Sequence, residues 1–126
     1  MYQLKRVYDF DEKDLPAVLA DRLWPRGIAK VRLKGVLWLK EVAPSTVLRQ
    51  WFHQDPEQRY PEFCQRYRME LGAPELQTDL QQLRQLYAQN NRLTLLTAAK
   101  EIDRCHLPVL ESVLRSVIDN PQQNNL

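Results

Sequence analysis

Short apolar runs and longer amphipathic segments alternate along this chain, and their order predicts an α/β fold. Three strand-like runs come first, at residues 4–9, 17–20 and 36–42. The fourth and strongest, 92–98, is a short apolar run with two threonines between polar turn residues, a pattern that favours a strand over a helix. Because few residues separate the first two runs, fewer than a parallel crossover usually needs, we expect them to pair as an antiparallel hairpin.

Four helices are expected where apolar residues recur every three or four positions. Their expected starting points are Ser45 as an N-cap, Pro61, Pro74 and Pro108. The first should end before Pro56 and the second at Gly72, a residue type common at helix ends. The last carries an apolar stripe between Leu110 and Ile118, which predicts that it packs on the sheet.

These elements predict a single, small, layered α/β domain over residues 1–119, with a mixed, mostly parallel sheet of about four strands flanked by helices. A length of 126 residues is typical of one domain. The polar residues 120–126 are expected to form a disordered tail.

Charge and cysteine content restrict the function classes. The chain has 18 basic and 16 acidic residues, too balanced for non-specific nucleic-acid binding by overall charge. It carries no apolar leader and no apolar run of membrane-spanning length. Cys64 and Cys105 are the two cysteines. We therefore expect a cytoplasmic protein with free thiols and no membrane association.

The stretch from Asp21 to Gly27 is the strongest candidate for a binding site. It follows a strand-like run, and it places Arg22 and Arg26 around a tryptophan and a proline. Guanidinium groups bind phosphate or carboxylate in a fixed geometry, and Asp21 could orient one of them, act as a general base, or only neutralise an arginine. The stretch predicts an anion-binding loop at a sheet edge.

Two further segments could face the same edge. Lys100 and His106 lie in the loop before the last helix, whose N-terminus favours anions, and His106 could transfer a proton. Around the third strand, Glu41, Ser45 and Arg49 could form a rim, with Ser45 also capping a helix. Asp21 and His106 are thus the candidate catalytic residues, and the others are candidate ligand-binding residues.

Metal and cofactor chemistry is not indicated. The two histidines and two cysteines lack the paired spacing of zinc sites, so we expect no metal. The three glycines are scattered, which excludes a P-loop. We expect no cofactor.

Several motifs together resemble one family. They are Lys5–Asp9, Asp21–Gly27, Pro44–Ser45 with Leu48–Arg49, Leu93–Leu96 with Ala99–Lys100, and His106 with Val109–Leu110. This set is similar to the domain of unknown function 488 family, in its small YeaO-like branch, from about Lys5 to Arg115. The resemblance implies an α/β domain of cytosolic proteins and supplies no reaction. In a longer branch a similar loop reads Cys-His-Arg; here Leu107 replaces that arginine, which weakens Cys105 as an essential nucleophile.

Two function classes follow. The first is an enzyme or binder for a phosphate-bearing or other anionic small ligand, such as a nucleotide, in which Arg22, Arg26 and Lys100 hold the charge. The alternative is a non-catalytic nucleic-acid or protein-binding module, with Trp24 as a stacking platform. Its basic face would comprise Arg6, Arg22, Arg26, Lys30, Arg32 and Lys34.

Overall fold

The structure is a computed structural model, and it describes residues 1–116. The strands are β1 (Tyr2–Arg6), β2 (Ala17–Leu19), β3 (Leu37–Trp38) and β4 (Leu93–Thr97), and the helices are α1 (Thr46–His53), α2 (Pro56–Leu71), α3 (Gln77–Asn90) and α4 (Leu107–Ser116). The α/β class and the four strands are confirmed. The boundary predicted at residue 119 and the tail at 120–126 lie outside the described residues. Within residues 1–116, no helix is long and apolar enough to cross a membrane.

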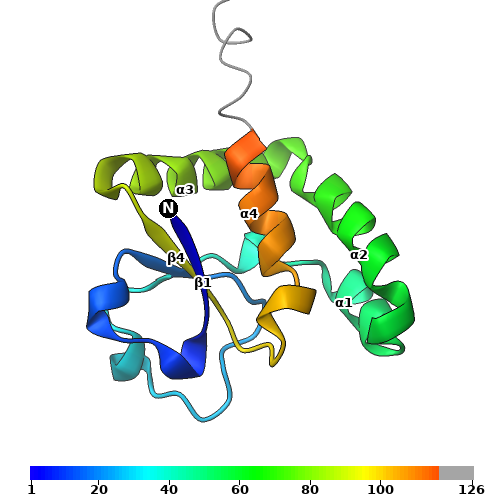
Figure 1. Cartoon of the computed structure of the whole chain (residues 1–126), viewed down its shortest axis with the longest axis horizontal. Coiled ribbons are helices and arrows are strands. Elements are labelled where there is room, and N and C mark those ends of the chain that lie inside the picture. Colours follow the sequence, from blue (N-terminus) through cyan, green and yellow to red (C-terminus); the bar gives the residue numbers. More distant parts are fainter. Residues whose placement is uncertain (117–126) are drawn as a thin grey trace, which may run out of the picture.

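The four strands form one sheet in the order β1-β4-β2-β3, and every neighbouring pair is parallel. The antiparallel hairpin expected of the first two strands is therefore wrong. The last strand, β4, lies between β1 and β2, so the two cannot pair with each other (Figure 1). The connection from β1 to β2 contains two 3-10 turns, Val7–Asp9 and Glu12–Asp14, and crosses β4. It is short for a parallel crossover.

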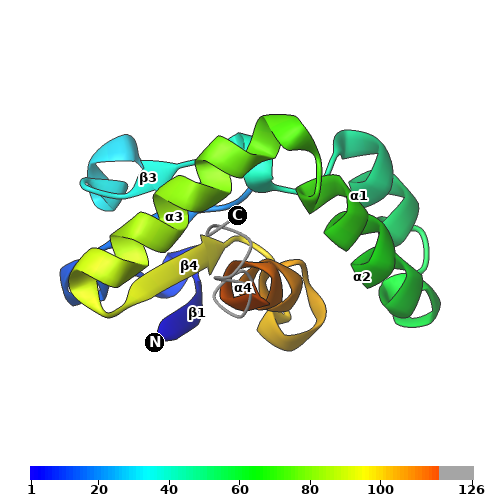
Figure 2. The same ribbon diagram turned by 90° about the horizontal axis from the view of Figure 1, so that it is seen from above.

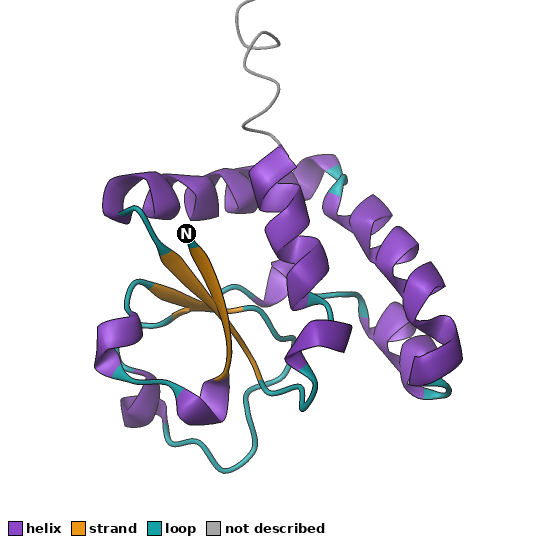
Figure 3. Cartoon of the chain, viewed as in Figure 1, coloured by secondary structure: helices purple, strands orange, loops and turns teal. Residues whose placement is uncertain are grey.

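The two faces of the sheet have different covers. All four helices contribute side chains to the core on one face, where Val18 of β2 points. Ala17 and Leu19 alternate to the other face, and 3-10 segments and loops cover that face with residues such as Phe10 and Leu33. Figure 3 shows the four long helices above and to the right of the strands, and short helical turns and loops at their lower left.

The helix starts were predicted with mixed success. Ser45 caps α1 as expected, but α2 begins at Pro56 and holds Pro61 inside it. Asp55 caps α2 and Pro56 takes its first position, a stronger start signal than Pro61 alone. The predicted end of α2 at Gly72 is confirmed. Its early start places α2 antiparallel to α1 after only a short turn, so the two helices form a pair beside the sheet (Figure 2).

Candidate functional site

A cavity of about 690 Å³ opens beside the carboxyl ends of the strands. Because all strands are parallel, the segments that follow them meet at one edge of the sheet, where α/β proteins commonly bind ligands. The cavity walls come from residues 21–26 after β2, residues 97–106 after β4, and the α1–α2 pair. Three segments that are distant in sequence thus enclose one space.

The structure brings most of the predicted site residues to this cavity. Those that line it are Asp21, Arg22, Arg26, Arg49, Lys100 and His106. Glu41 and Ser45 do not line it. The role of each residue in ligand binding stays a prediction. The surroundings of these residues divide them into two groups: those bonded to other parts of the protein and those whose charge is not neutralised.

Asp21 belongs to the first group. Its Oδ1 accepts a hydrogen bond from the Thr97 hydroxyl at 2.7 Å, and its Oδ2 accepts one from the Ala98 amide at 2.7 Å. The imidazole Nε2 of His106 lies 3.4 Å from Oδ1. The carboxylate therefore joins the ends of β2 and β4 and pairs with a histidine, and both of its oxygens are already engaged.

His106 is buried behind this carboxylate. Its Nε2 lies 2.6 Å from the Ala20 carbonyl oxygen, and since a carbonyl only accepts, Nε2 carries a hydrogen. Burial by itself lowers the pKa of His106, but the hydrogen bonds and charges of Asp21 and Cys105 outweigh burial and raise the pKa to about 9. The ring is therefore a cation at neutral pH, and it balances the charge of Asp21. Tyr67 meets it edge-on, with ring centroids 5.9 Å apart.

Arg22 also serves the protein itself. Its Nε donates to the Pro44 carbonyl at 3.1 Å and its Nη2 donates to the Ala43 carbonyl at 3.1 Å. Nη1 lies 3.4 Å from Glu41, whose side chain is 60% exposed. Arg22 thus fastens the loop after β2 to the segment that leads into α1. Glu41 is a surface partner of this arginine, outside the cavity.

Ser45 is engaged on both sides. Its hydroxyl accepts from the Leu48 amide at 3.2 Å, which caps α1, and donates to Glu70 Oε2 at 2.6 Å. The backbone amide of Ser45 donates to Glu70 Oε1 at 2.9 Å. Ser45 therefore fixes the start of α1 against α2 and holds Arg49, one turn later, at the cavity.

Replacing Ser45 with alanine should lower the free energy of unfolding by about 1–2 kcal/mol, because both the helix cap and the bond to Glu70 are lost. Chemical denaturation of the variant and wild type measures this difference. The control is Ser112→Ala, an exposed serine on α4, which should change the stability by less than about 0.5 kcal/mol. Equal effects of the two substitutions would contradict the assignment.

Four cations form the second group. Arg26, Arg49, Lys100 and Arg104 line the cavity, and no side chain among residues 1–116 forms an ion pair or a hydrogen bond with their charged groups. The Nε of Arg49 is buried and lacks any hydrogen-bond partner. His53 also lines the cavity, and burial, followed by the charge of Arg49, lowers its pKa. The cavity therefore holds positive charge that the described part of the chain does not neutralise.

Arg104, His53 and Thr97 line the cavity but were not among the predicted site residues. Arg104 lies in the same loop as Lys100, so loop membership alone could have indicated it. His53 stands four positions after Arg49, hence on the same face of α1. Thr97, the partner of Asp21, sits in an apolar strand, and only the parallel pairing of β2 and β4 reveals its role.

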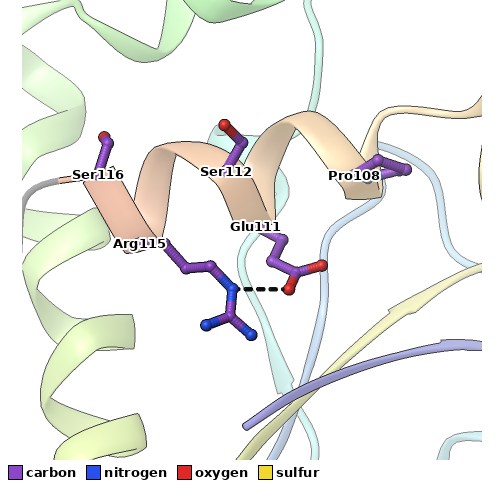
Figure 4. A pocket seen from close by; sticks show the side chains of 5 residues that line it. All are labelled: Pro108, Glu111, Ser112, Arg115 and Ser116. Carbon is purple, nitrogen blue, oxygen red and sulfur yellow. Dashed lines mark hydrogen bonds and ion pairs between the residues drawn. The ribbon is translucent and has the colours of Figure 1, made fainter.

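A second depression is shallow and has different lining residues. It lies along the outer face of α4, where Arg115 Nε donates to Glu111 Oε2 at 2.8 Å (Figure 4). Its charges are thus paired with each other. Within the described chain, no group of three or more His, Cys, Asp or Glu side chains lies close enough to hold a metal ion.

Comparison with known proteins places the chain in a family. The sequence model described as "Inactive DUF488-N3 subclade" matches residues 1–126. YeaO of Escherichia coli, an uncharacterised protein, is 42% identical over 118 residues, which cover 91% of this chain and 97% of YeaO. The uncharacterised protein Rv3073c of Mycobacterium tuberculosis is 41% identical over 113 residues, which cover 89% of this chain and 92% of that protein. No solved structure matches significantly. The chain therefore belongs to the DUF488 family, within the subclade described as inactive DUF488-N3.

Proposed function

We propose that this protein binds a small anionic ligand, bearing a phosphate or carboxylate group, in the cavity at the carboxyl edge of the sheet, and that it does so without converting the ligand. The observation that carries the proposal is the convergence of four cations, Arg26, Arg49, Lys100 and Arg104, which come from three segments and have no ionic partner in the described part of the chain. Unpaired cations that share one cavity repel one another, and an anion between them relieves that repulsion.

Arg49 supports the proposal most directly. Its Nε is shielded from solvent and has no acceptor among residues 1–116, an arrangement that costs free energy unless an acceptor arrives. The charge balance of the walls agrees: five Lys or Arg residues line the cavity against three Asp or Glu residues. One of those three, Asp21, is paired with His106, which leaves an excess of positive charge for a ligand.

Binding without catalysis is supported by two observations. The subclade that includes this chain is described as inactive. In addition, the two candidate catalytic groups, Asp21 and His106, bond to each other and to the backbone. Two short hydrogen bonds and the ring of His106 hold the Asp21 carboxylate in place, so its contacts are those of a group that joins strand ends.

The Arg49→Gln variant should bind inorganic phosphate about tenfold more weakly than the wild type, because one charge-assisted hydrogen bond is lost. Isothermal titration calorimetry measures the affinity, and thermal unfolding shows that the fold is unchanged. The control is Arg68→Gln, which removes the same charge from an exposed position of α2 outside the cavity and should leave the affinity unchanged.

Either of two results would overturn the proposal. One is the absence of phosphate binding by the wild-type chain at about 10 mM phosphate, a concentration that reveals even weak specific sites. The other is an equal loss of affinity in the Arg49 and Arg68 variants, which would indicate a general charge effect rather than a site.

The alternative of a nucleic-acid module gains no support from the geometry. Arg6 donates to the Ala99 carbonyl at 3.0 Å, and Arg32 donates to the carbonyls of Phe10 and Tyr8. Trp24 packs edge-on against Trp38 and donates its indole N–H to the Ile28 carbonyl at 2.7 Å. Arg6, Arg32 and Trp24 thus stabilise loops of the protein, and Trp24 is not available as a free stacking platform.

A further inference from the structure

We propose that the ligand of this cavity carries an apolar, ring-sized body beside its anionic group, as an aromatic phosphate or carboxylate does. This rests on the proposed function, since it specifies the part of the ligand that the four cations do not hold. The inference excludes two simpler ligand classes, a bare inorganic anion and a polyhydroxylated sugar phosphate.

The size of the cavity is the first argument. Its volume of about 690 Å³ falls within the range of sites that enclose small organic molecules. An inorganic phosphate would occupy only a small part of this space. The remainder must hold either water or the body of a larger ligand.

The chemistry of the walls is the second argument. Phe52 and Phe63 stack with ring centroids 4.2 Å apart and border the cavity on the side of α1 and α2. In the loop after β2, Leu23 also lines the cavity, with 63% of its surface exposed. The rest of the apolar lining comes from Trp24, Pro25, Ala43, Pro44, Pro56, Ala98 and Ala99. Contact of water with such apolar walls is unfavourable, and an apolar ligand body would displace the water from them.

Leu23 supports the inference more directly than the aromatic residues do. Phe52 and Phe63 are buried, and they stabilise the core whether or not a ligand binds. Leu23 belongs to neither core cluster, and it is an apolar residue in a loop that also holds charged residues. Its exposed side chain stabilises little in the free protein, but it would cover one face of a bound ring.

The scarcity of neutral hydrogen-bonding groups is the third argument. The hydroxyl residues that line the cavity are Thr97 and Tyr8. Thr97 donates to Asp21 and accepts from the Ala99 amide, and Tyr8 donates to the Arg26 carbonyl. The lining residues include no serine, asparagine or glutamine. The hydroxyls of a sugar would lose their bonds to water and find no free neutral side chain to bond among the residues that line the cavity, which costs affinity.

Titration calorimetry at pH 7.5 with three probes tests the inference. Phenyl phosphate should bind at least about tenfold more tightly than inorganic phosphate, because its ring leaves water, whereas glucose 6-phosphate should gain no such advantage. In Leu23→Ser the ratio of the affinities for phenyl phosphate and inorganic phosphate should fall about threefold. The control is Val31→Ser, which alters an exposed apolar residue outside the cavity and should change neither affinity.

The outcomes separate this inference from the proposed function. If phenyl phosphate, glucose 6-phosphate and inorganic phosphate bind equally and all depend on Arg49, the inference fails and anion binding stands. If phenyl phosphate binds equally to the wild type and to Arg49→Gln, the ring binds without the anion site and both proposals fail. An equal effect of Leu23→Ser and Val31→Ser would also overturn the inference.

Discussion

The Asp21→Ala variant should lose about 3–5 kcal/mol of unfolding free energy, the largest effect expected of any single polar substitution in the cavity. The carboxylate accepts from the Thr97 hydroxyl and the Ala98 amide and lies beside the charged ring of His106. Removing it leaves two donors without their acceptor and one buried cation without its counter-charge. Urea denaturation with fluorescence detection gives the difference directly.

Glu41→Ala provides the matched control, because it also removes one carboxylate that pairs with one cation. Glu41 is 60% exposed, whereas Asp21 is 14% exposed, so water screens the first pair and not the second. The control should cost less than about 1 kcal/mol. Similar losses in the two variants would show that the Asp21 network contributes little, and the structural role assigned to it would be wrong.

The second large effect is a loss of stability with rising pH. The pKa of His106 is about 9 in the folded protein, against an ordinary value of 6.5. The folded state therefore holds a proton that the unfolded state releases. This contribution, about 3 kcal/mol, is fully present below pH 6.5 and is lost as the pH rises through 9. Denaturation curves between pH 6.5 and 9.5 should show the decline.

The His106→Gln variant isolates this titration. A glutamine amide can still donate to the Ala20 carbonyl, but it carries no titrating proton. Its stability should therefore change little between pH 7 and 9. Asp21→Ala should also flatten the curve, since it removes a main source of the raised pKa. A decline of the same size in His106→Gln as in the wild type would contradict the charged state assigned to His106.

The sequence predicted the strands and helix starts best where a local signal was sufficient. Ser45 as an N-cap and the apolar run of β4 are such signals, and both were predicted correctly. The antiparallel hairpin failed because the rule used was local, whereas the partner of β1 comes about ninety residues later. Pro61 predicts a helix start because proline is common at that position, and Asp55 followed by Pro56 predicts a break, but in the structure Asp55 and Pro56 begin α2.

The candidate site shows the same division between local and distant information. Clusters of arginine and lysine located the segments that line the cavity, because anion sites need such side chains. What each side chain does could not be predicted. Arg22 and Arg26 stand four positions apart in one loop, yet backbone carbonyls of Ala43 and Pro44 engage the first and leave the second free. Only the packing of distant segments makes that distinction.

The central position of β4 has a consequence for biosynthesis. β4 is the last strand along the chain, and it pairs with both β1 and β2. As the chain leaves the ribosome, β1 has no strand to pair with until Thr97 has been made, and the sheet joins its two halves only then. The complete sheet can therefore form only after this five-residue strand has been made. The newly made β1 is therefore exposed to solvent and to chaperones for longer than the first strand of a hairpin would be.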